Sequence, residues 1–179
     1  MYRKPPQTSR PSGTGSPKEG LKKASMKEIL ISKLHEYIRE NNPDVLLQLE
    51  EDGKVTEYLS DKVSTVNALL NQLDKGQAGY IIEDSCMDAM TQDLRPSKYN
   101  YICNILEEEF ADKYQQLQQS GTLKFEVINL IHQCESVFED LNFSKENEDN
   151  RFTGYVIIGC ISEYFENVIS EQENVSDEL

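Results

Sequence analysis

The stretch TLKFEVINLIHQCESVFEDL, residues 122–141, decides the fold class. Its apolar side chains recur at steps of three and four residues, which places them on one face of an α-helix. Thr122 can cap the start of this helix, and the pair Ser120-Gly121 ends the segment before it. A helix with such a face needs other apolar faces to pack against, so the stretch predicts a helical domain. The apolar positions are Leu123, Val127, Leu130, Ile131, Cys134, Val137, Phe138 and Leu141.

The same apolar spacing continues on both sides of this stretch and predicts a succession of helices. Their boundaries follow from turn and capping residues such as Pro43, Gly76 and the pair Arg95-Pro96. The polar residues 144–151 predict a loop before the last helix. The expected helices cover about residues 26–41, 43–51, 55–74, 77–92, 96–119, 122–141 and 153–172.

Two local details of this pattern can be tested directly. Asn42 stands where its side chain can cap the short helix that begins with Pro43. The segment Tyr155–Ile161, near the start of the last helix, is rich in β-branched residues and also suits a strand. We favour a helix because the apolar periodicity continues for about four turns, which is longer than a typical strand.

Together these segments predict an all-α protein, with a single multi-helix, bundle-like domain of six or seven helices over residues 26–170. Residues 1–25 are rich in Pro, Gly and Ser, so we expect a disordered basic leader there. Residues 171–179 carry four acids and no base, and we expect this acidic tail to fray. Met26 begins a clean amphipathic segment, so a translation start at Met26 in place of Met1 is an alternative.

Charge is divided unevenly along the chain. Residues 1–25 hold six basic groups and one acid, whereas residues 26–179 hold 12 basic and 31 acidic residues. An acidic surface repels nucleic-acid phosphates and membrane headgroups, so we expect a protein partner with a basic surface, and at most weak nucleic-acid contact through the leader. The sequence shows no apolar run of the roughly 18 residues that a membrane span needs and no signal-peptide pattern, so we expect a cytoplasmic protein.

Residues that could hold a metal or act in catalysis are few. His132 and Cys134 are two positions apart on one helix, about 200° around its axis, so they cannot chelate one ion together. His132 and Glu135 can share a face, but neither His132 nor His35 has the preceding Glu that a di-iron bundle requires. We therefore expect no catalytic residue, no metal, no cofactor and no enzyme activity.

The other reactive side chains also have simple structural explanations. Cys86, Cys103, Cys134 and Cys160 are far apart and lie on or beside apolar stripes, which is typical of inert, reduced thiols. The run Glu107–Glu109 fans around a helix and predicts a solvated face. An enzyme in which the fold brings a thiol and an imidazole together stays open as an alternative.

These observations favour a non-enzymatic, acidic interaction module that binds a basic protein surface, aided by exposed Tyr side chains. The alternative is a DNA mimic, whose carboxylates imitate a phosphate array and block a host nuclease of the anti-restriction or anti-CRISPR type. A DNA-binding regulator is disfavoured because no predicted helix carries several Arg or Lys on one exposed face.

Several patches of the sequence resemble a bacterial family. The opening LHEYIRENNP (34–43) is similar to the family start YLRE-x-HP. LRPSKY (94–99) and ILEEEFA (105–111) are similar to GL-x-F-S-x-Y and VL-x-x-EF, and FTGYV (152–156) with YFE (164–166) is similar to LTG-x-I and YLE. The family is the domain of unknown function numbered 1896. The resemblance implies a small helical accessory protein of a conjugative or transposable element, and it carries over no functional residue.

Overall fold

The computed structural model describes residues 17–72 and 76–176, which form ten α-helices, one short 3-10 helix and no strand. The all-α fold class is therefore confirmed. In chain order the elements are α1 (Pro17–Asn41), α2 (Pro43–Glu51), α3 (Val55–Thr65), α4 (Asn67–Leu70), α5 (Gly79–Thr91), η2 (Gln92–Leu94), α6 (Lys98–Glu109), α7 (Ala111–Ser120), α8 (Leu123–Gln133), α9 (Glu135–Asp140) and α10 (Arg151–Ser176).

The helices outnumber the six or seven expected because three long predicted helices are each divided at one residue. Val66 separates α3 from α4, Phe110 separates α6 from α7, and Cys134 separates α8 from α9. The backbone of each residue leaves helical geometry, yet Val66 and Cys134 stay buried and Phe110 packs against Phe165. The apolar spacing therefore runs across each break, and periodicity alone does not reveal it.

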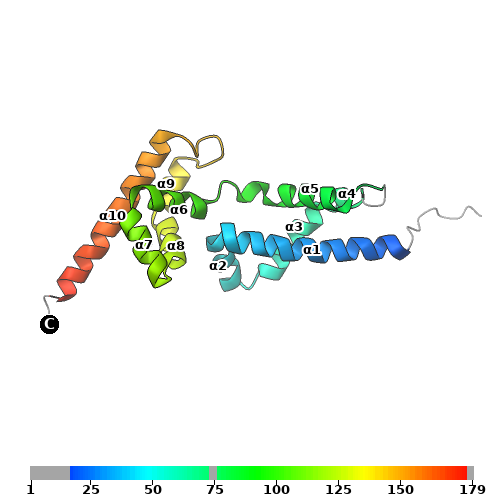
Figure 1. Cartoon of the computed structure of the whole chain (residues 1–179), viewed down its shortest axis with the longest axis horizontal. Helices are drawn as coiled ribbons and strands as arrows, with labels where there is room; N and C mark the ends of the chain where they lie inside the picture. The colour runs from blue at the N-terminus through cyan, green and yellow to red at the C-terminus, as the bar shows by residue number, and fades with distance from the viewer. Residues whose placement is uncertain (1–16, 73–75, 177–179) are drawn as a thin grey trace, which may run out of the picture.

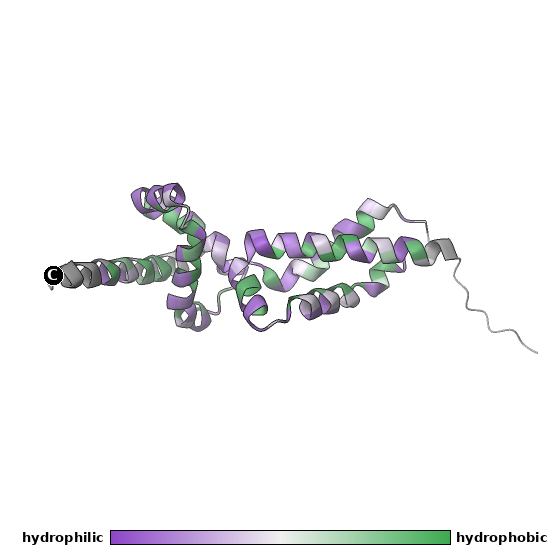
Figure 2. Ribbon diagram, turned by 90° about the horizontal axis from the view of Figure 1, so that it is seen from below, coloured by the Kyte–Doolittle hydropathy of each residue, from purple (hydrophilic) through white to green (hydrophobic). Residues whose placement is uncertain are grey.

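The buried side chains form two separate cores, one for each half of the chain. Helices α1 to α5 with η2 make an N-terminal lobe, and α6 to α10 make a C-terminal lobe. Figure 1 shows the two lobes at opposite ends of an elongated molecule. Figure 2 shows apolar and polar residues alternating along the helices, as amphipathic packing requires. The buried apolar side chains of this helical protein thus fall into two clusters, one in each lobe.

The N-terminal lobe is organised by α1, which packs against α2, α3 and α5. Leu30, Leu34 and Ile38 lie on one face of α1 and are fully buried. Burying a side chain of this size stabilises a fold by about 1.5–3 kcal/mol. The start of α1 corrects the sequence expectation, because α1 begins at Pro17 and residues 17–25 are helical. Residues 1–16 of the expected leader lie outside the described residues.

The C-terminal lobe is built around α8, which packs against α6, α7, α9 and α10. An aromatic cluster closes one side of it, with ring centroids 6.3 Å apart for Tyr101 and Phe138 and 4.9 Å apart for Phe138 and Phe143. Edge-to-face pairs of this kind add to the energy of apolar burial. Ile157 and Ile161 of α10 complete the core.

Helix α10 is continuous through Tyr155–Ile161, so the preference for a helix over a strand is confirmed. The helix also reaches Ser176 and includes residues 171–176 of the expected frayed tail, whereas 177–179 lie outside the described residues. Among the residues that the structure describes, no helix combines the length and apolarity needed to cross a bilayer.

The two lobes meet where α2 packs against α8 and where the chain passes from η2 to α6. Ser97 caps α6 by accepting a hydrogen bond of 2.9 Å from the backbone N–H of Asn100, and its hydroxyl donates to the carbonyl of Asn41. Asn42 occupies the N-cap position of α2, but its side chain does not cap the helix. Instead, Asn42 Nδ2 donates to the carbonyl of Leu94 at 3.1 Å, which ties α2 to the end of the N-terminal lobe.

Candidate protein-interaction surface

An acidic groove lies between α6 and the start of α10, with a volume of about 330 Å³. Four carboxylates line it, opposed by one cation, Arg151. None of the four forms an ion pair with another residue of the described chain. Their negative charge is therefore available to an incoming cation. The carboxylates belong to Glu108, Glu109, Glu148 and Asp149.

Local hydrogen bonds hold the loop side of this groove in place. Asn147 Oδ1 accepts from the backbone N–H of Ser144 at 2.8 Å, and Asn147 Nδ2 donates to the carbonyl of Leu141 at 2.9 Å. Asn150 Oδ1 accepts from the backbone N–H of Phe152 at 2.8 Å, as an N-cap side chain does at the start of a helix. Glu148 and Asp149, between these two Asn residues, are thereby positioned beside α6.

Aromatic side chains lie inside and beside the groove. The Tyr101 ring lines it, and burial raises the pKa of Tyr101, with a further increase from the charges of Asp149 and Glu148. The Tyr101 hydroxyl therefore stays protonated and can donate a hydrogen bond. Phe152 and Tyr155 lie in the first turns of α10 and are 66% and 68% exposed. Residues three apart share one face of a helix, so these two rings form one exposed aromatic surface.

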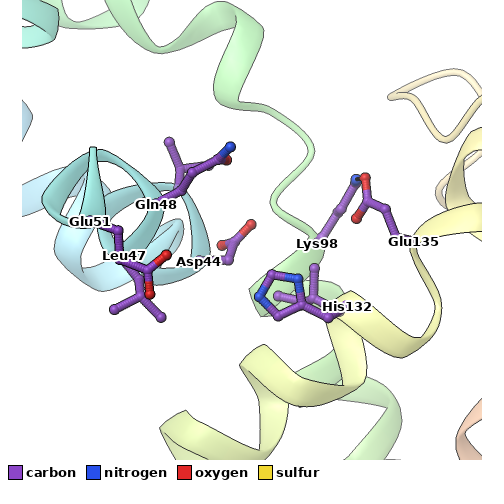
Figure 3. Close-up of a pocket in the computed structure, with 9 residues that line it drawn as sticks. Asp44, Leu47, Gln48, Glu51, Lys98, His132 and Glu135 are labelled. Carbon is purple, nitrogen blue, oxygen red and sulfur yellow. Dashed lines mark hydrogen bonds and ion pairs between the residues drawn. The ribbon is translucent and has the colours of Figure 1, made fainter. Parts of the chain in front are cut away.

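A second cavity, which we call the junction pocket, lies between the lobes and has a volume of about 500 Å³. Figure 3 shows side chains from α2 facing those from α6, α8 and α9 across it. Lys98 donates to Glu135 at 2.8 Å, and its ammonium lies 5.3 Å from the centroid of the Phe138 ring. The Asp44 carboxylate points into the space between α2 and His132, and its Oδ1 is buried without a hydrogen-bond partner.

The electrostatics of Asp44 are set mainly by its burial. Burial raises the pKa of the carboxyl group, and this effect outweighs the backbone N–H groups of Asp44 and Val45, which lower it. The positive charge of Lys98 also lowers the pKa, whereas the negative charge of Glu135 raises it. The pocket therefore contains a carboxylate that its own surroundings stabilise poorly.

The two histidines, His35 and His132, lie in different lobes. His132 lies near the end of α8 and Glu135 begins α9, on either side of the break at Cys134, and both line the junction pocket, whereas His35 lies half-buried on α1. Within residues 17–72 and 76–176, no group of three or more His, Cys, Asp or Glu side chains could hold a metal ion.

All four cysteines are free thiols, and Cys86 and Cys134 are buried in the two cores. Burial raises the pKa of Cys86, and it raises that of Cys103 to about 11 despite a hydrogen bond from Tyr99. The pKa of Cys134 is raised by burial and then by its neighbour Cys160. Cys86, Cys103 and Cys134 are therefore protonated at neutral pH, and thiols in this form are poor nucleophiles.

The run Glu107–Glu109 is exposed, as the sequence predicted, but Glu108 and Glu109 also line the acidic groove. Sequence reasoning missed the rest of that groove and did not single out Asp44 or Lys98. Asp44 and Lys98 are 54 positions apart in the chain and line the same pocket because α2 and α6 both pack on α8. One local feature of the sequence did bear on Asp44. An acidic residue directly after Pro43 indicates the start of a helix, and this places Asp44 in the first turn of α2.

Comparison with known proteins gives one family. No curated protein matches the chain, and no solved structure matches it either. The profile of the family described as Domain of unknown function (DUF1896) matches residues 29–155. This match covers both lobes, from α1 to the exposed aromatic turn of α10. The chain therefore belongs to the DUF1896 family.

Proposed function

We propose that this protein is a non-enzymatic interaction module that binds a basic protein surface through its acidic groove. The observation that carries the proposal is the set of four unpaired carboxylates that line one groove beside exposed aromatic rings. The wider lobe reinforces this charge, because residues 98–176 contain 15 acidic and five basic residues. A partner that carries Lys or Arg on its surface is attracted and oriented by such a field.

The exposed rings add contact energy that the carboxylates lack. Solvent-exposed ion pairs contribute about 0–1 kcal/mol each, so four carboxylates alone give weak binding. Phe152 and Tyr155 offer large apolar surfaces next to the groove, and aromatic residues are enriched among the side chains that dominate binding energy. We therefore assign affinity mainly to the rings, and attraction and orientation to the carboxylates.

Several finer expectations remain predictions. The role on a mobile element predicts transfer or transposition genes beside the gene for this chain. DNA mimicry predicts that the protein inhibits a nuclease at low salt and loses that inhibition as salt rises. Both the cytoplasmic location and the lack of enzyme activity stay predictions as well.

The test is co-purification of the tagged full chain from its native cells at low and moderate salt, with two charge-reversal variants compared. The groove variant carries Glu108→Lys and Glu109→Lys. The control variant carries Glu139→Lys and Asp140→Lys, two exposed acids of α9 that do not line the groove, so its net charge changes equally. We expect the groove variant to capture at least about tenfold less partner than the unmodified chain does, and the control variant to capture as much as the unmodified chain.

Two outcomes contradict the proposal. Equal loss in both variants shows that only net charge matters, and equal retention shows that the groove is not used. A Tyr155→Ala variant then tests the aromatic contribution: its binding should fall at both salt concentrations, because apolar contact is not screened by ions.

A further inference from the structure

One side chain that lines the junction pocket, Asp44, has a polar atom that lacks a hydrogen-bond partner. Asp44 Oδ1 is buried and accepts no hydrogen bond from the described residues. Leaving a carboxylate oxygen buried and unpaired is unfavourable unless a partner completes the site. Lys98 does not complete it, because its ammonium pairs with Glu135 and lies over the Phe138 ring.

The charge around the pocket favours a cation as the missing partner. Three acidic residues, Asp44, Glu51 and Glu135, line it against one lysine and one histidine. An anionic ligand would meet this excess of negative charge. A metal ion is disfavoured because no group of three or more His, Cys, Asp or Glu ligands comes together in the part of the chain that the structure describes.

The walls of the pocket favour an arginine side chain over a compact cation. Val45, Leu47 and Ile131 supply apolar surface on which a methylene stem can lie. A guanidinium is planar, pairs with a carboxylate through two parallel hydrogen bonds and loses its hydration more easily than an ammonium. The pocket volume of about 500 Å³ is within the range of ligand sites in proteins.

We propose that the junction pocket receives an arginine side chain of the basic partner and pairs its guanidinium with Asp44. This inference rests on the proposed function, because the arginine comes from that same partner. The bound arginine contacts α2 from one lobe and α8 and α9 from the other, so it also holds the two lobes together.

The test uses the full chain labelled with ¹⁵N and the probe Nα-acetyl-L-arginine amide, followed by amide chemical shifts. We expect saturable shifts at the amides of α2, α8 and α9 around the pocket. Binding in the millimolar range is expected, because a small ligand lacks the rest of the partner interface. Nα-acetyl-L-citrulline amide, which has nearly the same shape without the charge, should give no saturable shift at these amides.

A variant pair identifies the carboxylate that binds. Asp44→Asn should weaken arginine binding at least about tenfold, because it removes the charge and keeps the size of the side chain. Asp61→Asn, on the exposed surface of α3, is the matched control and should bind as the unmodified chain does. The citrulline comparison uses the unmodified chain and gives an answer whatever the stability of the variants.

The inference is overturned if the arginine probe gives no saturable shift at the pocket, if citrulline binds equally, or if Asp44→Asn binds as tightly as the unmodified chain. The Glu108→Lys and Glu109→Lys variant should still bind the arginine probe. If the probe fails while this groove variant still loses the partner, the junction pocket is refuted and the proposed function stands. If instead the arginine probe binds as expected and the groove variant keeps the partner, the acidic groove is refuted and the junction pocket stands.

Discussion

Asp44 links stability to pH through a single carboxyl group. Burial raises its pKa in the folded protein, so the folded state holds this proton more tightly than the unfolded chain does. The stabilising effect of the bound proton is complete below the unfolded-state pKa and is lost as pH rises through the folded-state value. The charged groups that face Asp44 are Lys98 of α6, Glu135 of α9 and Glu51 of α2, with His132 of α8 beside them.

We predict that Asp44→Asn stabilises the isolated protein at neutral pH. Asparagine keeps the shape of aspartate and carries no charge, so it removes the cost of desolvating a carboxylate whose Oδ1 is buried without a hydrogen-bond partner. The expected gain in the free energy of unfolding is about 1 kcal/mol. Urea denaturation at neutral and at acid pH measures this effect.

The gain should shrink toward zero as the pH falls through the titration range of Asp44, because the native side chain is then neutral too. Asp61→Asn should change stability little at either pH, since Asp61 is exposed. A destabilised Asp44→Asn protein at neutral pH contradicts the explanation, because it would mean that the carboxylate is well stabilised where it lies.

Asn42 shows why single-residue expectations fail at the junction. Its position before Pro43 was predicted from local capping rules, and it does hold the N-cap position. Its amide nevertheless donates to Leu94, 52 positions along the chain. Local sequence sets the backbone position here, whereas a long-range contact decides what the side chain binds.

At the scale of the helices, sequence periodicity was a good guide to location and a poor guide to continuity. The long apolar pattern around Cys134 correctly placed the central helix of the C-terminal lobe. It missed the break at Cys134 because that residue stays fully buried. The early start of α1 was missed for a different reason, because Pro17 is tolerated in the first turn and the Pro, Gly and Ser content of the leader masked the helix.

Two glycines should respond in opposite ways to the same substitution. Gly121 ends α7 with φ at +72°, a conformation that costs an L-residue about 1–2 kcal/mol, so Gly121→Ala should destabilise by that amount. Gly159 lies inside α10 on its exposed side, so Gly159→Ala should stabilise by about 0.5–1 kcal/mol. Apart from the adjacent residues and, at Gly159, the nearby backbone of α10 itself, no described atom lies within 4 Å of the added Cβ at either site.

Because neither added methyl group contacts the side chain of another element, the two changes in stability report the conformational preference of the backbone alone. Midpoints of urea denaturation, measured for the two variants in parallel, check the prediction. A loss of stability in both variants would show that α10 does not keep helical geometry at Gly159 in solution.

At the scale of the whole molecule, the two cores were not predictable from composition. The helices of both lobes carry the same kind of apolar stripe. Nothing in the apolar spacing around Leu94 shows that the helices before it and the helices after it bury their stripes in separate cores. The sequence predicted an excess of acidic residues, but not the groove that four of them line. Its carboxylates come from α6 and from the loop before α10, which are about 40 positions apart in the sequence.

We predict that the lobes lose structure separately. Leu34→Ala removes a fully buried side chain from the N-terminal core and should cost about 2–5 kcal/mol there. Amide hydrogen exchange should then become faster in α1, α3 and α5, while α8 and α10 keep most of their protection.

Ile161→Ala, in the core of the C-terminal lobe, is the reciprocal control and should expose α8 and α10 first. Uniform loss of protection through the whole chain, in either variant, would show that the junction couples the lobes into one cooperative unit.

Each lobe is made from one uninterrupted length of chain, which matters during synthesis on the ribosome. Most contacts of α1 to α5 can form before α8 has emerged, and domains generally fold as units in this order. The face of α2 that carries Asp44 stays in water until α8 arrives. Oδ1 of this carboxylate is thus hydrated in the nascent protein and becomes buried only when α8 packs against α2.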